Sequence, residues 1–175
     1  MTLSTTHPDG PAPARGTPRT LLERARDGFA RIPEAGVALL GRLSIAAVFW
    51  RSGQTKIEGF ALDPAAGNFT LGWPRLSENA LLLFEYEYAV PLLAPGTAAL
   101  LATVAEHLFP LLLVLGLGTR WAALGLLAMT GVIQIFVYPG AWPTHGVWAA
   151  VLLWLLVRGA GALSLDHWLA RRARR

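Results

Sequence analysis

The 175-residue chain has no cysteine and few charged residues, and both shortages narrow its function. Without thiols it cannot form disulfides, use thiol catalysis, hold a thiolate-bound iron–sulfur cluster or attach haem covalently. Charged residues make up 15% of the chain, against about 25% in soluble domains, and apolar residues make up 54%. This composition is typical of an integral membrane protein. Redox chemistry would therefore require a bound cofactor or a partner protein.

A helix needs about 20 residues to cross the hydrocarbon core of a bilayer, and the chain has four apolar runs, of which the last is short unless it extends from Trp142 to Gly161. They cover approximately residues 35–53, 95–116, 120–138 and 144–157. We therefore predict an all-α fold, an integral membrane four-helix bundle within residues 34–168. The second and third runs are separated by a very short turn, so these two helices should be antiparallel neighbours.

The segments outside this bundle have different compositions. Residues 1–18 are rich in proline, threonine and alanine without a hydrophobic period, which predicts a disordered tail. Residues 19–33 place leucine and phenylalanine on one helical face and arginine on the rest. This pattern predicts a basic amphipathic helix on an anionic leaflet, and a solvated helical linker is the alternative. Residues 169–175 form a basic tail.

Arginine is distributed unevenly between the two sides of the predicted bundle. One side carries Arg15, Arg19, Arg24, Arg26, Arg31, Arg120, Arg158, Arg171, Arg172, Arg174 and Arg175. The other side carries Lys56 and Arg75, with Arg51 at its boundary. By the positive-inside rule both termini are cytoplasmic and residues 56–94 face outward. We thus expect a multi-pass protein of the bacterial inner membrane.

The outward segment is the longest connection in the chain, and we expect it to be a long outer loop that contains a short surface helix. Asp63-Pro64 and Gly72-Trp73-Pro74 are turn signals. The helix is expected over residues 77–88, with Ser77 as its N-cap. Acidic residues outnumber basic ones here, so the outer mouth of the bundle should be acidic.

Glu106 and His107 lie together in the middle of the second apolar run. An ionisable side chain at bilayer depth costs about 2.5–3.5 kcal/mol on insertion scales, so it is seldom kept without a partner or a task. Arg42, roughly 10 Å into the first span, is the expected partner of Glu106. Two interpretations remain open: a structural ion pair that fixes helix packing, or a charged site for a polar ligand or for protons.

Other polar residues could line the same niche. At 100° per residue Arg42, Gly53 and Lys56 share one stripe of the first helix, and Gly53 leaves room for a backbone or a ligand. His107 and Gln134 are either packing residues with interhelical hydrogen bonds or ligand contacts. The predicted ligand-binding residues are Arg42, Gly53, Lys56, Glu106, His107 and Gln134. No catalytic residue and no metal site is predicted.

Several longer motifs together resemble the DoxX family of small four-helix bacterial inner-membrane proteins. They are Gly41-Arg-Leu, residues 49–56 (Phe-Trp-Arg-Ser-Gly-Gln-Thr-Lys), residues 105–120 from Ala-Glu-His to Gly-Thr-Arg, residues 129–138 and residues 158–166. The similarity extends over roughly residues 40–168. It implies a four-helix bundle with both ends inside, and Arg42, Gly53, Lys56, Glu106 and Gly116 match the polar and glycine positions of the family.

Members of the family are associated with membrane oxidoreductases, including a thiosulfate:quinone oxidoreductase, and others resemble proteins encoded in metal-stress gene clusters. The absence of cysteine argues against a direct role in sulfur redox chemistry. The resemblance implies an accessory or quinone-interacting subunit of a membrane oxidoreductase system, with a quinone as candidate cofactor. Its partners would be the lipid bilayer and other membrane or periplasmic subunits, and not nucleic acid. The alternative is a non-enzymatic scaffold or small transporter in metal or oxidative stress handling.

Overall fold

The computed structural model describes residues 20–63 and 67–175, so the predicted disordered tail lies outside the described residues. The chain divides into two units, residues 1–32 and 33–175. The described part of the first unit contains one helix, α1 (Leu21–Phe29), as expected from the sequence. Leu21, Leu22 and Phe29 are exposed on it. The location of α1 on a membrane surface stays a prediction.

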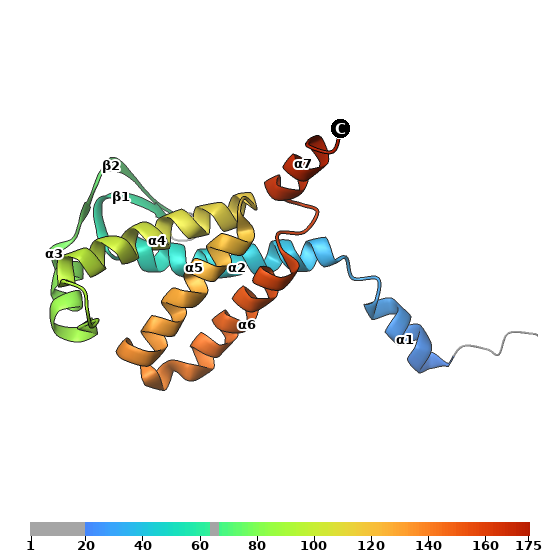
Figure 1. Ribbon diagram of the computed structural model, residues 1–175, viewed down its shortest axis with the longest axis horizontal. Coiled ribbons are helices and arrows are strands. Elements are labelled where there is room, and N and C mark those ends of the chain that lie inside the picture. Colours follow the sequence, from blue (N-terminus) through green and yellow to red (C-terminus); the bar gives the residue numbers. More distant parts are fainter. Residues whose placement is uncertain (1–19, 64–66) are drawn as a thin grey trace, which may run out of the picture. The chain divides into compact units, whose positions relative to one another are not determined.

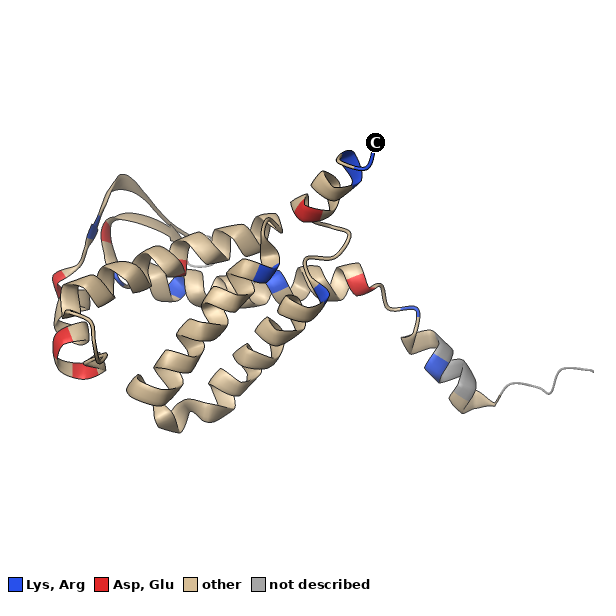
Figure 2. Cartoon of the chain, in the orientation of Figure 1, with Lys and Arg blue, Asp and Glu red and all other residues tan. Residues whose placement is uncertain are grey.

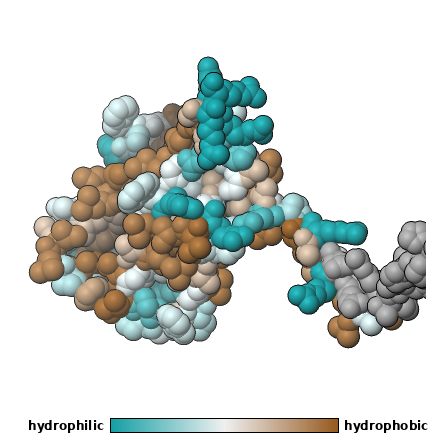
Figure 3. Space-filling model, turned by 45° about the vertical axis from the view of Figure 1, so that its right-hand side comes forward, coloured by the Kyte–Doolittle hydropathy of each residue, from teal (hydrophilic) through white to brown (hydrophobic). Residues whose placement is uncertain are grey.

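In the part of the second unit that the structure describes, four helical segments are long and apolar enough to span a membrane. They are α2 (Glu34–Gln54), α4 (Pro95–Leu115), α5 (Thr119–Val132) and α6 (Trp142–Arg158) (Figure 1). A π-helical turn (Ile133–Val137) extends α5, and a 3-10 turn (Pro139–Ala141) precedes α6. The predicted all-α membrane bundle is therefore confirmed. Apolar residues cover much of the face of the bundle that Figure 3 shows.

The turn between α4 and α5 is fixed by two glycines. Gly116 ends α4 with φ 65° and Gly118 precedes α5 with φ 56°, both in the left-handed region that favours glycine. Such a short turn makes α4 and α5 antiparallel neighbours, as predicted. Between them, Gly125 of α5 leaves space for the ring of Phe109, which an added Cβ would approach to 2.5 Å.

The bundle has two ends that differ in charge. Glu34 at the start of α2 forms an ion pair of 2.6 Å with Arg158 at the end of α6, so the first span begins where the last one ends. We call this the turn end, because the α4–α5 turn lies there, and the opposite one the hairpin end. Figure 2 shows acidic residues around α3 at the hairpin end and arginines near the α4–α5 turn and α7. That the turn end is cytoplasmic stays a prediction.

The connection between α2 and α4 contains a β-hairpin that we did not expect from the sequence. Strands β1 (Ile57–Asp63) and β2 (Asn68–Leu76) pair antiparallel. Asp63 is the last residue of β1 and Pro64 lies outside the described residues, whereas Gly72-Trp73-Pro74 lies inside β2, where the register of the pairing shifts. Proline in a strand is tolerated at an edge or a bulge, so here it is not a loop signal.

The expected surface helix follows the hairpin. It consists of α3 (Glu78–Leu82) and a π-helical turn (Leu83–Tyr88). The hydroxyl of Ser77 accepts a hydrogen bond of 3.1 Å from the backbone N–H of Ala80, so Ser77 is the N-cap as predicted.

The last helix, α7 (Leu165–Arg172), is attached to the turn end through Asp166. Its carboxylate accepts hydrogen bonds from the backbone N–H groups of Gly118 (2.8 Å) and Thr119 (3.0 Å) at the start of α5. Its own backbone N–H donates to the carbonyl of Gly116. A carboxylate at a helix N-terminus is stabilising, so Asp166 both caps α5 and holds the segment after α6 in place.

Gly53 should be essential for the close contact of α2 with α4. An added Cβ would lie 2.7 Å from Cε1 of His107, whose ring is held by hydrogen bonds. We expect Gly53→Ala to lower the unfolding free energy by about 1–3 kcal/mol through overpacking. Gly131→Ala is the control, because an added Cβ there meets nothing within 4 Å. Thermal unfolding in detergent tests this, and equal midpoints for the two variants would contradict it.

Candidate functional site: a buried charge cluster in an apolar cavity

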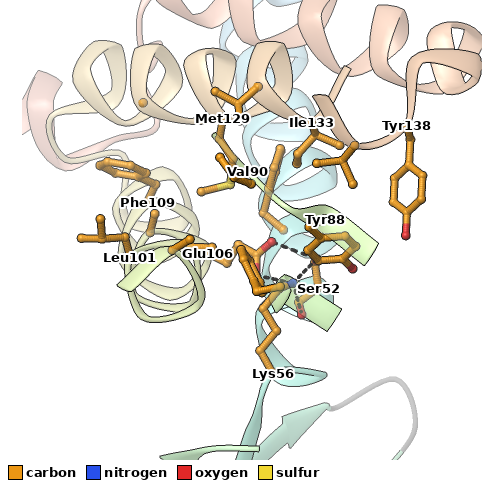
Figure 4. Close-up of a pocket in the computed structure, with 18 of the residues that line it drawn as sticks. Ser52, Lys56, Tyr88, Val90, Leu101, Glu106, Phe109, Met129, Ile133 and Tyr138 are labelled. Atoms are coloured by element: carbon orange, nitrogen blue, oxygen red, sulfur yellow. Dashed lines mark hydrogen bonds and ion pairs between the residues drawn. The ribbon is translucent and has the colours of Figure 1, made fainter. Parts of the chain in front are cut away.

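Glu106 is paired with Lys56 inside the bundle. The ammonium Nζ of Lys56 lies 2.7 Å from Oε2 of Glu106, and the two side chains are only 8% and 4% exposed. Lys56 Nζ also donates to the backbone carbonyl (3.2 Å) and the hydroxyl (3.1 Å) of Ser52. The Ser52 hydroxyl in turn donates to Oε1 of Glu106 at 3.0 Å. These three residues form the charge cluster (Figure 4).

Helix geometry explains why Lys56 reaches this position. It follows the end of α2 by two residues, and its ammonium lies against a carbonyl of the last turn, where the helix dipole favours a cation. Arg42, Phe49, Gly53 and Lys56 are all buried, which confirms that this stripe of the first helix faces inward. Ser52 is four residues before Lys56, so the two side chains lie on the same helical face.

The predicted pairing of Arg42 with Glu106 is wrong. Arg42 is fully buried, but its guanidinium lies at the last turn of α4 and donates to the carbonyls of Leu113 (3.0 Å) and Val114 (3.3 Å). It also donates to the carbonyl of Leu163, in the segment before α7. Arg42 thus links α2, α4 and the chain after α6 at the turn end. The long arginine side chain reaches toward that end, which leaves Lys56 as the cation beside Glu106.

The charge cluster forms part of the wall of a cavity of about 510 Å³. Most other lining residues are apolar and come from α4, α5 and the π-helical turn after α5, among them Phe109, Met129 and Ile133. Figure 4 shows Glu106, Ser52 and Lys56 on one side of the cavity and Met129 and Ile133 on the other. The site therefore combines a largely apolar interior with a compact group of hydrogen-bonding side chains.

His145 of α6 is a further polar residue in the cavity lining, and it is buried. Its Nδ1 lies 2.7 Å from Oε1 of Gln134, while Nε2 of Gln134 donates to the carbonyl of Pro139 at 2.6 Å. Since Pro139 fixes the orientation of the amide, Oε1 must accept from Nδ1–H of His145. A neutral His145 then offers Nε2 as a hydrogen-bond acceptor. Gln134 does not line the cavity and orients His145; its role as a ligand contact stays a prediction.

His107 and Gly53 lie between α2 and α4 and do not line this cavity. Nδ1 of His107 donates to the carbonyl of Thr103 at 2.7 Å, and Nε2 lies 2.9 Å from Nε2 of Gln54. Gly53 has no room for a ligand, because His107 and Glu106 fill the space beside it. The structure therefore brings together Lys56 and Glu106 from the predicted set, and adds Ser52 and His145. The i, i+4 spacing of Ser52 and Lys56 was the signal that could have identified Ser52.

Two tyrosines lie at the hairpin end of the cavity. Tyr88 and Tyr138 both line it, and their rings pack edge to face with centroids 5.9 Å apart. The hydroxyl of Tyr138 donates a hydrogen bond to Glu87. This bond raises the pKa of Tyr138, because the carboxylate stabilises the protonated phenol, and burial acts in the same direction. Tyr138 is therefore a neutral donor that links the cavity lining to the segment before α4.

Comparison with known proteins agrees with this architecture. The family model for DoxX matches residues 37–139, which extend from α2 to the 3-10 turn before α6. The chain belongs to the DoxX family. No curated protein and no solved structure matches it. Family membership and the four apolar helices together identify a multi-pass membrane protein in contact with the lipid bilayer. Lys56, Ser52 and Glu106 lie within the matched region, whereas His145 lies outside it.

The charge cluster can be tested with a double-mutant cycle. Lys56→Met leaves the Glu106 carboxylate buried without a cation, so we expect a loss of about 3–5 kcal/mol in unfolding free energy. The double variant Lys56→Met/Glu106→Leu removes both charges and should recover most of this loss. The single variant Glu106→Leu and the wild type complete the cycle, and thermal unfolding in detergent measures all four proteins.

The ion pair of Arg51 with Asp63, at 3.6 Å and with side chains that are 70% and 22% exposed, provides a control closer to the surface. Arg51→Met should cost no more than about 1 kcal/mol, because surface pairs contribute little. If the double variant were no more stable than Lys56→Met alone, the two charges would not be energetically coupled.

Proposed function

We propose that this DoxX-family protein is an accessory subunit of a membrane oxidoreductase system in a bacterial inner membrane and that it binds a quinone in the cavity. The observation that carries the proposal is the charge cluster in the wall of an otherwise apolar cavity within the membrane-spanning part of the chain. A volume of about 510 Å³ lies within the range of about 300–1,000 Å³ typical of small-molecule sites.

The polar groups suit both redox forms of a quinone ring. The ammonium of Lys56 is the donor for a carbonyl oxygen of the oxidised form: one N–H that it now gives to Ser52 would turn to the quinone, while the Ser52 hydroxyl stays bonded to Glu106. A neutral His145 is an acceptor for a hydroxyl of the reduced form. In this arrangement Glu106 balances the charge of Lys56, and these residues bind and orient the ring. The quinone itself would carry electrons, and a partner subunit would exchange them, because the chain has no thiol for this chemistry.

The tail of a quinone also needs a route to the lipid. Leu101 of α4 and Val132 of α5 line the cavity and are also exposed at the surface of the bundle, by 54% and 39%. Leu93, in the segment before α4, also lines the cavity and is 45% exposed at the surface. An isoprenoid tail leaving the cavity past these side chains would stay in apolar surroundings.

Mass spectrometry of the organic extract of purified protein tests this function. We expect near-stoichiometric quinone in the wild type and at least about a tenfold lower content, equivalent to about 1.4 kcal/mol, in Glu106→Gln. Ala105→Phe should also lose the quinone, because Ala105 lines the cavity and a phenyl group would fill it without changing the charge cluster. Glu58→Gln, the same chemical change at an exposed site on β1, is the control and should retain it.

A wild-type extract without quinone would overturn the proposal. The protein would then be better explained as a non-enzymatic membrane partner in metal or oxidative stress handling. Within residues 20–63 and 67–175, no group of three or more histidine, aspartate or glutamate side chains is arranged to hold a metal ion. A metal bound by these residues would consequently need further ligands besides these side chains.

A further inference from the structure

A second apolar space lies on another face of α4, between that helix and the β-hairpin. It is a groove of about 640 Å³. The hairpin contributes Phe60 and Leu76, and α4 contributes Leu100, Val104, Leu108 and Leu111. The two spaces share no lining residue, so a ligand in the groove would be independent of the cavity.

The hairpin is held against the spanning helices rather than projecting away from them. Nε1 of Trp50 donates to the carbonyl of Leu62 at 2.8 Å, and Oε1 of Gln54 accepts from the backbone N–H of Leu62 at 2.7 Å. Both helical residues lie in the last two turns of α2, so β1 folds back beside that helix. In lipid, an unpaired backbone group costs several kcal/mol. These two bonds satisfy the backbone of Leu62 on the side of the strand that faces α2.

The α4 wall of the groove is continuous with the lipid-facing surface of the bundle. Leu100, Val104, Leu108 and Leu111 recur every three or four residues and are each 47–51% exposed. From Leu100 to Leu111 the helix rises about 16 Å. This is approximately half of the hydrocarbon thickness of about 30 Å, which is the depth of one leaflet. The groove thus has the length and surface of an acyl-chain site.

One cation is available at the groove. Arg75 of β2 lines it and is exposed. Glu58 is its cross-strand neighbour, but no ion pair joins them. The other polar lining residues are engaged, since the Thr103 hydroxyl donates to Ala99 and His107 is bonded through both ring nitrogens.

Arg75 lies toward the outer end of the groove. Three residues later the chain enters α3, and Leu81 of α3 lies beside Gly96 in the first turn of α4. The leucine and valine stripe extends from there toward the middle of the span. The groove therefore has a cation at one end, where a lipid phosphate would lie, and beyond it an apolar stripe as long as one leaflet, where an acyl chain would lie.

We propose that this groove is a binding site for one anionic phospholipid of the leaflet at the hairpin end. Its phosphate lies at Arg75 and one acyl chain lies along the Leu100–Leu111 stripe. Exposed Phe69, Leu71 and Trp73 on β2 extend the apolar surface of the hairpin into the same leaflet. The hairpin is thereby a lipid-binding element of the membrane domain and not a free outer loop.

Native mass spectrometry of the full chain, purified from bilayers of phosphatidylcholine and phosphatidylglycerol, tests the site. We expect the wild type to retain one phosphatidylglycerol. Val104→Trp fills the groove and should abolish retention. Leu124→Trp, at an exposed position of α5 outside the groove, is the control for a large side chain and should retain the lipid.

The charge contribution is tested with Arg75→Gln. We expect this variant to prefer phosphatidylglycerol over phosphatidylcholine about fivefold less than the wild type does. The reason is that one arginine near the membrane surface strengthens the binding of an anionic lipid by about this factor. Arg51→Gln removes the same charge from the same end of the bundle outside the groove and should keep the preference. Absent retention in the wild type, unchanged retention in Val104→Trp, or equal effects of the two arginine variants would each overturn the proposal. Quinone content, measured on the same samples, should not change, so the two proposals fail separately.

Discussion

A carboxylate in the middle of a membrane-spanning helix must be compensated, and the ion pair of Glu106 with Lys56 provides this compensation. Lys56 follows the end of α2, so the pair fixes how far α2 extends along α4. Gly53 permits the approach, because a larger residue would collide with His107. The unexpected β-hairpin begins directly after Lys56 and is therefore placed beside the same part of α4. The position of one charge thus determines the helix offset, the cavity wall and the start of the hairpin.

Polar contacts join α2 to α4 at three levels. Lys56 meets Glu106, Gln54 meets His107, and Arg42 meets the carbonyls at the end of α4. Helix association in a bilayer gains little from the hydrophobic effect, since lipid tails are as apolar as leucine side chains. Hydrogen bonds and glycine contacts must supply the specificity instead. The interface between α2 and α4 contains both hydrogen bonds and a glycine contact, which accounts for the polar residues in these otherwise apolar spans.

The two faces of α4 have different uses. Glu106 and Phe109 face the cavity, whose polar groups support the proposed quinone site. Val104 and Leu108 face the groove under the hairpin, which supports the proposed phospholipid site. A periodicity of 3.6 residues per turn lets one helix present both surfaces within a few residues. Membership of the DoxX family accounts for the architecture, and the chemistry of these two surfaces is the basis for the functional proposals.

The membrane class, the four spans, the short turn after α4, the Ser77 cap and the need of Glu106 for a polar partner could all be predicted from the sequence. These features depend on local hydropathy, helical periodicity and residue conformation, which a single segment encodes. Three features could be seen only in the folded chain: Lys56 rather than Arg42 pairs with Glu106, Gln134 orients His145, and residues 57–63 pair with residues 68–76 as a hairpin. Each of these outcomes depends on the offset between elements distant in the chain and on the direction in which long side chains extend. Local sequence patterns do not specify either quantity.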